Sequence, residues 1–190
     1  MTNRVLVQPR RRTLSRATGR ILEIGFGTGA NLAHYPAGVT RIEAIDPDAD
    51  LDRFSQPRIA RSGIEVDFHH LDAERLPFGS GSFDTVVCTL TLCSIPHVED
   101  ALAEVRRVLR PGGRFLFLEH GLAPDATVAR WQHRLDPLQQ RLAGGCHLTR
   151  ETLPLLKGAG LEVEGASQYY LQGVPRFMGY VTEGSAVRSR

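Results

Sequence analysis

Short apolar runs alternate with polar stretches from residue 20 to residue 120. The runs cover residues 20–24, 40–45, 64–68, 83–92 and 114–119, and the first two end directly before a glycine and an aspartate. Runs of this length between turn-forming residues predict β-strands, and the longest is typical of a central strand buried on both faces. The sequence therefore predicts five strands in this part of the chain.

Helical spacing of apolar residues fills several of the intervals between these strands. Between residues 97 and 109 apolar side chains recur every three or four positions, and a Pro-Gly-Gly sequence follows as a stop signal. Helices are also predicted over 125–142 and over 149–159, the latter with Thr149 as its N-terminal cap. The glycine-rich turn after the first strand is predicted to lead into a short helix that ends before Pro36.

The order of these elements predicts the fold class. Strands that alternate with helices pair in parallel through right-handed crossovers, which puts helices on both faces of one sheet. The end of the chain differs, because 161–170 and 176–182 read as two β segments without a helix between them and predict a hairpin. We expect an α/β fold with a doubly wound, mostly parallel seven-stranded sheet, helices on both faces and an antiparallel last strand.

Composition and charge bear on the domain organisation. A chain of 190 residues that is 42% hydrophobic and 23% charged fits one domain. The net charge is only +2, yet six arginines and no acidic residue precede Glu23. We expect a basic, partly disordered arm over 1–19, a folded domain over 20–183 and a flexible tail over 184–190.

Several classes of protein are disfavoured by what the chain does not contain. No apolar run approaches the ~20 residues of a membrane span, and the N-terminus lacks the apolar core of a secretory signal. Cys88, Cys93 and Cys146 form neither an even set nor a C-x-x-C pair, so we expect buried thiols and no metal site. The expectation is a soluble, cytoplasmic protein without a membrane span; the oligomeric state stays open, with a homodimer among the alternatives.

The strongest local signal is the sequence Glu-Ile-Gly-Phe-Gly-Thr-Gly over residues 23–29. Glycines let a ligand lie against the turn, and the start of a helix offers free N–H groups to it. Gly25, Gly27 and Ala30 also satisfy the dinucleotide pattern, with Asp46 at the distance of a ribose-binding carboxylate. Taken alone, the loop allows either S-adenosylmethionine (SAM) or a nicotinamide dinucleotide.

The neighbouring residues favour SAM. Glu23 suits the ammonium of an amino acid better than a pyrophosphate, because a carboxylate attracts a cation and repels phosphate. Asp46 is expected to accept hydrogen bonds from the ribose, and Asp72 to meet the adenine unless it merely caps a helix. The full set expected at the cofactor is Glu23, Gly25, Phe26, Gly27, Thr28, Gly29, Asn31, Asp46, Pro47, Asp72, Ala73, Thr89 and Leu90.

An ordered series of motifs resembles the class I SAM-dependent methyltransferases. LEIGFGTGA, AIDPD, LDAERLPF, SFDTVVCTLTLCSI, EVRRVLRPGG and FLEH follow one another between residues 20 and 120. LDP, GCHLTRET and the closing GYV extend the likeness to about Val181 and are similar to the methyltransferase-like proteins that methylate alkyl thiols. The resemblance implies a methyltransferase domain over 20–183 that uses SAM, releases S-adenosylhomocysteine and methylates a small, lipophilic acceptor, best an alkyl thiol.

Residues for the acceptor are expected near the carboxyl ends of the strands and in the late segments. Methyl transfer depends mainly on positioning, but a thiol acceptor needs its thiolate favoured, and His120 is the candidate base or orienting group. Its alternative role is a histidine satisfied by a backbone carbonyl. The expected acceptor pocket comprises Cys93, Trp131, His147, Arg150, Tyr169 and Tyr170, with simple packing as the alternative for Trp131.

The chain also departs from the thiol methyltransferases. Those proteins begin with a hydrophobic, membrane-associating segment, whereas fewer than twenty residues precede the first strand here. We therefore do not carry over a membrane location, and we expect a site that is more open or that relies on a partner chain.

Other functions remain alternatives. These are an NAD(P)-dependent oxidoreductase, which would lack an obvious Tyr/Lys pair, a non-catalytic SAM-binding subunit, and methylation of a phospholipid amine or a quinone-like ring. Nucleic acid is not expected as a partner, because the fourth strand leads into Thr89-Leu90-Thr91-Leu92 rather than an amine-binding element.

Overall fold

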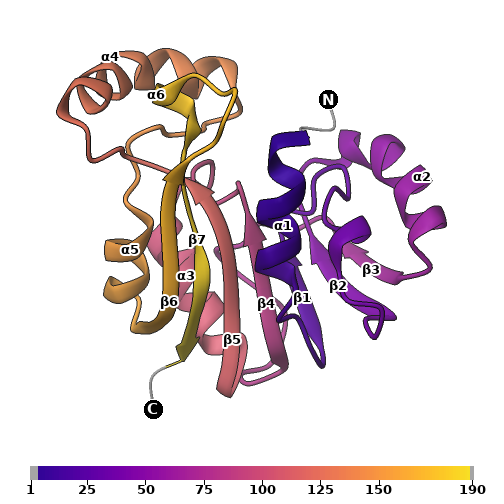
Figure 1. Ribbon diagram of the computed structural model, residues 1–190. Helices are drawn as coiled ribbons and strands as arrows, with labels where there is room; N and C mark the ends of the chain where they lie inside the picture. Colours follow the sequence, from indigo (N-terminus) through magenta and orange to yellow (C-terminus); the bar gives the residue numbers. More distant parts are fainter. Residues whose placement is uncertain (1–3, 189–190) are drawn as a thin grey trace.

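The computed structural model describes residues 4–188, and a single twisted sheet runs through its centre (Figure 1). The seven strands lie in the order β3-β2-β1-β4-β5-β7-β6. Their bounds are β1 Ile21–Ile24, β2 Arg41–Ile45, β3 Glu65–His69, β4 Phe83–Thr89, β5 Leu109–His120, β6 Leu161–Tyr170 and β7 Tyr180–Arg188. This sheet confirms the predicted fold class.

The direction of the strands also confirms the prediction. Strands β1 to β5 pair in parallel, whereas β7 lies antiparallel between β5 and β6. The chain builds the sheet outward from β1 to β3, then returns to β4 on the other side of β1. The carboxyl ends of β1 and β4 therefore form the switch point, where open α/β sheets bind ligands.

Helices cover both faces of the sheet (Figure 1). Helices α3 and α5 lie on one face and α1 on the other, while α4 and α6 contact each other beyond the carboxyl end of β5. The helical bounds are η1 Arg4–Leu6, α1 Val7–Leu14, η2 Leu32–His34, η3 Ala49–Leu51, α2 Asp52–Ser62, α3 Val98–Val108, α4 Ala126–Leu142, α5 Thr152–Gly158 and α6 Arg176–Gly179. Among the described residues, no helix combines the length and the apolar character that crossing a bilayer requires.

Alternating side chains of the central strands feed two hydrophobic cores. Leu22 and Ile24 of β1 pack in the cluster that includes Leu102 of α3. Ile21 points to the opposite face and packs in the cluster that includes Leu14 of α1. Because successive side chains of a strand point to opposite faces, a strand covered on both sides buries apolar side chains on each, and Glu23 is the one polar residue of β1.

The two ends of the chain are more ordered than expected. Instead of a partly disordered arm, residues 4–14 form η1 and α1, because the apolar side chains of Leu6 and Leu14 are buried against the sheet. Residues 184–188 of the expected tail belong to β7 and pair with β5 and β6. Residues 1–3 and 189–190 lie outside the described part, and the domain boundaries themselves stay predictions.

Two elements near the glycine-rich loop are shorter than predicted. The helix expected after the loop is only the 3₁₀ turn η2, because Tyr35 must leave the helical region before Pro36. Strand β4 ends at Thr89 rather than at residue 92, because Leu90 adopts a left-handed conformation with φ of 56° that turns the chain.

Prolines explain two differences between the predicted and the observed elements in the last third of the chain. Helix α5 begins at Thr152 and not after Thr149, since this start places Pro154 in the first turn, where its missing N–H costs nothing. Pro175 likewise precedes the single turn α6, so the strand expected from residue 176 begins only at Tyr180. The other predicted helices are confirmed within two residues, with Asp125 capping α4.

Candidate active site

A cavity of about 480 Å³ opens at the switch point, at the carboxyl ends of β1, β2 and β4. Its volume is in the range of small-molecule and cofactor sites. All residues of the expected cofactor set line it except two, Gly29 and Asn31. The lining members of that set are Glu23, Gly25, Phe26, Gly27, Thr28, Asp46, Pro47, Asp72, Ala73, Thr89 and Leu90.

Two glycines shape the floor of the cavity for different reasons. Gly25 has a positive φ of 73°, and a Cβ there would lie 2.1 Å from the Thr91 hydroxyl oxygen. Gly27 also has a positive φ of 54°, but nothing lies within 4 Å of where its Cβ would stand. Gly25 therefore permits the turn to pack on the neighbouring loop, whereas Gly27 leaves open space beside the cavity.

Asp46 holds the glycine-rich turn and the end of β2 together. One carboxylate oxygen accepts a hydrogen bond from the Gly27 N–H at 2.8 Å and the other accepts one from the Asp48 N–H at 3.0 Å. The residue is 8% exposed and lines the cavity. Each carboxylate oxygen can accept more than one hydrogen bond, so Asp46 retains acceptor capacity toward a ligand.

Glu23 is a buried acid in the wall of the cavity. Its two oxygens accept hydrogen bonds from the Asn31 amide at 2.9 Å and from the Tyr35 hydroxyl at 2.6 Å. Burial raises the pKa of Glu23 to about 7, although these two hydrogen bonds and the nearby Arg10 favour its charged form. Asn31 does not line the cavity and acts instead as the support of Glu23.

Arg10 reaches the cavity from α1 and was missed by sequence reasoning. Its guanidinium donates hydrogen bonds to the Asn31 side-chain oxygen at 2.5 Å and to the Thr89 hydroxyl at 2.7 Å. Burial lowers the pKa of Arg10, and the negative charge of Glu23 opposes that shift. The acid-free N-terminus was a signal for basic residues, but it did not indicate which arginine enters the site.

Further lining residues come from two loops. Leu90 to Pro96, after β4, contributes Thr91, Ser94, Ile95 and Pro96, and the turn after α4 contributes Ala143 and Gly144. The left-handed conformation of Leu90 begins the first loop, and strained backbone of this kind is often found at functional sites. Sequence reasoning missed the second loop because nothing in its own residues indicates that it returns to the sheet.

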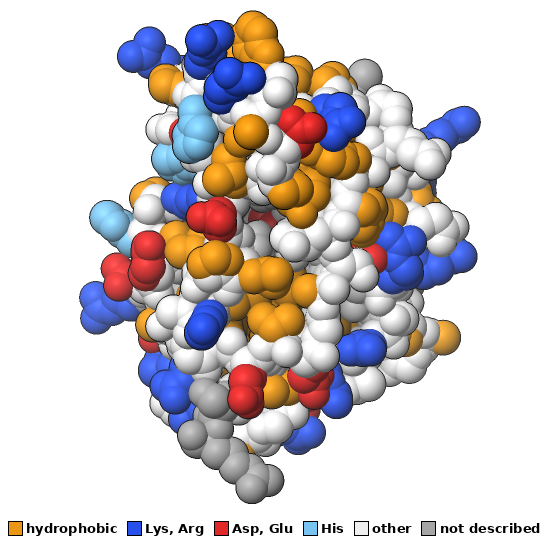
Figure 2. Space-filling model, turned by 60° about the vertical axis from the view of Figure 1, so that its left-hand side comes forward, with side chains coloured by type: hydrophobic (Ala, Val, Ile, Leu, Met, Phe, Trp, Pro, Cys, Tyr) orange, Lys and Arg blue, Asp and Glu red, His pale blue; other side chains and the backbone are white. Residues whose placement is uncertain are grey.

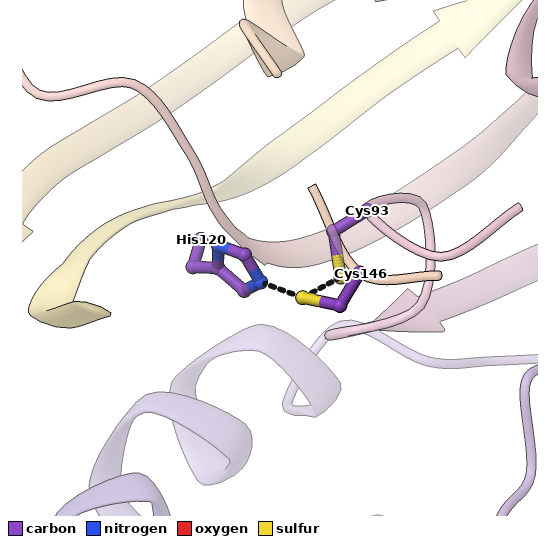
Figure 3. A group of neighbouring side chains, drawn as sticks. All are labelled: Cys93, His120 and Cys146. Carbon is purple, nitrogen blue, oxygen red and sulfur yellow. Dashed lines mark hydrogen bonds between the residues drawn. The ribbon is translucent and has the colours of Figure 1, made fainter. Parts of the chain in front are cut away.

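His120, the expected catalytic residue, lies behind the loops that wall the cavity and is not part of its lining. Its Nε2 atom is 2.9 Å from the sulfur of Cys146, and that sulfur is 3.6 Å from the sulfur of Cys93 (Figure 3). The three side chains come from the end of β5, the turn after α4 and the loop after β4, and they point toward one another (Figure 3).

Electrostatics in this cluster favours charge on the histidine and on one sulfur. The hydrogen bond between the two sulfurs lowers the pKa of the Cys146 thiol, and His120 lowers it further. Burial lowers the pKa of His120, but contact with Cys146 and the charge of Glu119 outweigh it, so the net shift is upward. Burial also raises the pKa of Glu119, whose carboxylate accepts hydrogen bonds from the Thr91 N–H.

The other residues expected in an acceptor pocket are not gathered at the cavity. His147 and Arg150 line a separate depression between α3 and α5. Tyr169 hydrogen-bonds Glu183 and Arg12, and the Tyr170 ring packs against Tyr180, with ring centroids 5.1 Å apart.

Trp131 lies on the outer surface of α4. Its side chain is 53% exposed, and the guanidinium of Arg134 stands over the ring. Figure 2 shows basic and hydrophobic side chains side by side at the α4 end of the molecule. Of the six residues expected in an acceptor pocket, Cys93 is the one beside the cavity wall, because its sulfur is 3.6 Å from the hydroxyl of the lining Ser94.

Comparison with known proteins gives the site a context. Residues 22–117 match a methyltransferase domain. The human thiol S-methyltransferase TMT1A is 43% identical over 149 residues, which cover 73% of this chain and 58% of that protein. The phosphatidylethanolamine N-methyltransferase of Cereibacter sphaeroides is 32% identical over 73% of this chain and 70% of its own length. The match to this chain thus spans less than two thirds of the length of the human relative.

A solved structure shows the same fold. A SAM-dependent methyltransferase from Methanosarcina mazei superimposes with a TM-score of 0.71 over 95% of this chain and 97% of that one, at 20% sequence identity. At this identity the likeness bears on the fold alone. It agrees with the doubly wound sheet.

Proposed function

This chain belongs to the methyltransferase domain family, and on that premise we propose that it is an enzyme that transfers the methyl group of SAM to a small alkyl thiol. The observation that supports an alkyl thiol as the acceptor is the 43% identity to a thiol S-methyltransferase over 73% of this chain. The proposed products are a methyl thioether and S-adenosylhomocysteine. We further propose a cytoplasmic enzyme whose partners are SAM and the small acceptor, with no nucleic acid.

The lining of the cavity fits the nucleoside part of SAM. Asp46 is fixed by two backbone N–H groups and has free acceptor capacity for the ribose hydroxyls. The space beside Gly27 is open, so the ligand can lie against the backbone of the turn. Asp72 and Ala73, also in the lining, are proposed to flank the adenine.

The charges at the other end of the cavity fit the amino acid part of SAM. Arg10 and Glu23 both line the cavity, one as a cation and the other as an acid whose pKa is near neutrality. A free amino acid end carries one carboxylate and one ammonium, so this pair complements both charges. The same pair is poorly suited to a pyrophosphate, because Glu23 would repel it; this disfavours the dinucleotide alternative.

Once bound, SAM supplies a methyl group on a positively charged sulfur, and the protein mainly has to align the acceptor with it. We propose that Ser94, Ile95, Ala143 and Gly144 border the acceptor, since they complete the lining on the side away from β2. Direct proton transfer from the acceptor to His120 is not supported by its position, because its Nε2 atom contacts Cys146.

The cofactor is tested first, before any acceptor has to be chosen. Purified protein is titrated calorimetrically with S-adenosylhomocysteine, NADH and NADPH in separate experiments. We expect binding of S-adenosylhomocysteine only. Binding of a nicotinamide cofactor instead would contradict the proposed use of SAM and would favour the oxidoreductase alternative.

The accepting atom is tested with a matched series. Hexanethiol, hexylamine and hexanol differ only in sulfur, nitrogen or oxygen, and each is incubated with SAM in a buffer free of thiol reductants. Mass spectrometry should detect the methylated thiol and neither of the other products. A reaction without protein serves as the control for background alkylation. Methylation of the amine alone would replace the thiol by an amine acceptor, in line with the bacterial relative.

A further inference from the structure

We propose that Cys93, His120 and Cys146 bind one zinc ion, and that this ion holds the acceptor thiol as a thiolate beside the cofactor cavity. The inference rests on the proposed thiol methylation and adds to it the site that activates the acceptor. It also revises the expectation of no metal site, which was based on spacing along the sequence. The ligands lie 26 and 53 residues apart along the chain, so no local motif reveals them.

The distance between the two sulfurs is close to that of a tetrahedral zinc site. With Zn–S near 2.3 Å and Zn–N near 2.0–2.1 Å, two sulfurs should lie about 3.8 Å apart and a sulfur and a nitrogen about 3.6 Å apart. The sulfurs of Cys93 and Cys146 are 3.6 Å apart, and the ligand atoms of all three residues lie within 4.8 Å of one another. The Nε2 atom of His120 and the sulfur of Cys146 are 2.9 Å apart because they share a hydrogen bond. A bound ion would take the place of this hydrogen bond, and the two atoms would move slightly apart.

The chemistry of the donors selects zinc among common metals. Two thiolates and one imidazole are soft and borderline ligands, which suit zinc and exclude magnesium or calcium. Three protein ligands leave one position of a tetrahedron open, which is the pattern of catalytic rather than structural zinc. The open position is the one that an acceptor sulfur would take.

The surrounding structure holds the ligands in place. The two loops that carry the cysteines are joined by a hydrogen bond from the His147 N–H to the Cys93 carbonyl oxygen at 2.9 Å. Arg150 donates a further hydrogen bond to the carbonyl oxygen of Leu92. The Gln139 amide lies 3.8 Å from the sulfur of Cys146 and donates toward it. Outer contacts of this kind orient the ligands of metal sites.

The cluster lies directly behind the wall of the cofactor cavity. Ser94 lines the cavity, and its hydroxyl is 3.6 Å from the sulfur of Cys93. Gly144, two residues before Cys146, lines the same cavity. Cys93 and Cys146 are buried, at 3% and 8% exposure, which limits the access of water. The proposal therefore places the open position of the ion between Ser94 and Gly144, facing the cavity, so that an acceptor sulfur on the ion can meet the cofactor.

Zinc changes the acceptor in a way that the transfer needs. A thiol that coordinates zinc loses its proton to solvent, so the sulfur is a thiolate at neutral pH. An electron pair of that sulfur forms the new bond to the methyl carbon, and the bond from this carbon to the cofactor sulfur breaks with its electrons staying on the cofactor. The product is a neutral thioether, a weaker ligand than a thiolate, so it can leave the ion.

The test measures metal as well as activity. Untagged protein, purified without chelators, should contain one zinc per chain by elemental analysis. Replacement of the zinc by cobalt should produce the intense near-ultraviolet absorption of thiolate–cobalt bonds. Cys146→Ser and His120→Ala should lower zinc affinity at least tenfold and lower thiol methylation, while binding of S-adenosylhomocysteine stays within about twofold of wild type. That binding also reports that the variants are folded.

Cys88→Ala is the matched control, because Cys88 is equally buried but lies outside the cluster. It should keep its zinc and its cobalt spectrum. Zinc-free protein that methylates hexanethiol at the wild-type rate would overturn the proposal that zinc holds the acceptor and would leave the proposed function standing. A disulfide between Cys93 and Cys146 in the freshly purified protein would also overturn it. Zinc-loaded protein that methylates only the amine would instead refute the thiol acceptor and its coordination.

Discussion

The two sides of the cofactor cavity are built in different ways. On the β1–β2 side, most contacts come from two short continuous segments, the glycine-rich turn at 23–30 and residues 45–48. On the opposite side, Arg10 comes from the first helix and Thr89 from the end of β4, and further residues come from loops near 90–96 and 143–144. The first side is a motif, whereas the second exists only when distant parts of the chain have folded together.

This difference has a consequence for stability and binding. A side made from short continuous segments at the ends of formed strands can lose affinity with little loss of fold, because no distant segment has to pack there to complete it. A side assembled from distant segments depends on the packing of each segment. Substitutions should therefore distinguish the two sides. On the first side affinity should change more than stability, whereas on the second side the two should change together.

The largest expected effect is on the packing of α1. Leu14 is fully buried in the core between α1 and the sheet, so Leu14→Ala should lower the free energy of unfolding by about 2–5 kcal/mol. Denaturant titration measures the change. Leu142→Ala is the control, because that side chain is 77% exposed and its loss should cost less than about 0.5 kcal/mol. Equal stability of the two variants would mean that α1 is not part of the core.

On the motif side, Asp46→Ala should weaken binding more than it lowers the free energy of unfolding, although it also removes two hydrogen bonds to the backbone. Removal of its charge-assisted hydrogen bonds should cost about 1–3 kcal/mol of affinity for S-adenosylhomocysteine, or about 5- to 150-fold in Kd. Calorimetry gives the affinity. Asp50→Ala removes the same charge from an exposed position outside the cavity and should bind normally. Unchanged affinity in Asp46→Ala would remove this residue from the site.

On the assembled side, Arg10→Ala should affect only ligands that carry a carboxylate. We expect about a 5- to 30-fold loss of affinity for S-adenosylhomocysteine, equal to about 1–2 kcal/mol for a partly exposed charged hydrogen bond. Methylthioadenosine lacks the amino acid end and should bind wild type and variant equally. Arg11→Ala, at the exposed neighbouring position, is the control. A loss for both ligands would show that Arg10 acts through the fold and not through the carboxylate.

The smallest expected effect is a pH dependence that comes from Glu23. Only the ionised acid attracts the ammonium of the cofactor, and its pKa is about 7. Affinity for S-adenosylhomocysteine should therefore fall about threefold to tenfold between pH 8 and pH 6. Glu23→Gln should bind weakly at both pH values. A wild-type affinity that is flat across this range would place the ammonium elsewhere.

The stability of the ligand-free protein should change with the opposite sign. Because the pKa of Glu23 is raised from 4.5 to about 7 on folding, its contribution is most favourable below pH 4.5 and is lost as the pH rises to about 7. The free energy of unfolding of wild type should decrease relative to that of Glu23→Gln over this window. Urea titrations at pH 4.5, 6 and 7.5 measure the difference.

Much of the fold could be predicted because its signals are local. The strands that run through the centre are continuous apolar segments, and α3 and α4 have both helical spacing and end signals. Helix α2 was not predicted, because Pro57 interrupts its interior and few of its residues are apolar. The order of α1 was also missed, since the arginines between its apolar residues suggested a solvated segment although Leu6 and Leu14 anchor it.

The site divides in the same way. Residues in the glycine-rich turn and Asp46 were predicted, since a motif fixes both their identity and their place at the ends of strands. Arg10 and Gly144 were not, because their position depends on how α1 and the end of α4 pack. Trp131 was expected in the pocket from its residue type alone, and the structure places it on the outer face of α4. Residue type without a known position is a weak predictor of a binding role.

The first helix connects the occupancy of the cavity to the behaviour of the N-terminus. Arg10 belongs to α1 and also to the lining of the cavity, so a ligand that engages it favours the docked helix. Because loss of the Arg10 contact is expected to cost about 1–2 kcal/mol of affinity, saturating ligand should stabilise the docked helix by up to the same amount. Amide exchange and protease cleavage within residues 4–14 should therefore slow down when the cofactor is bound. These two measurements on α1 would then report how much of the protein has cofactor in its cavity.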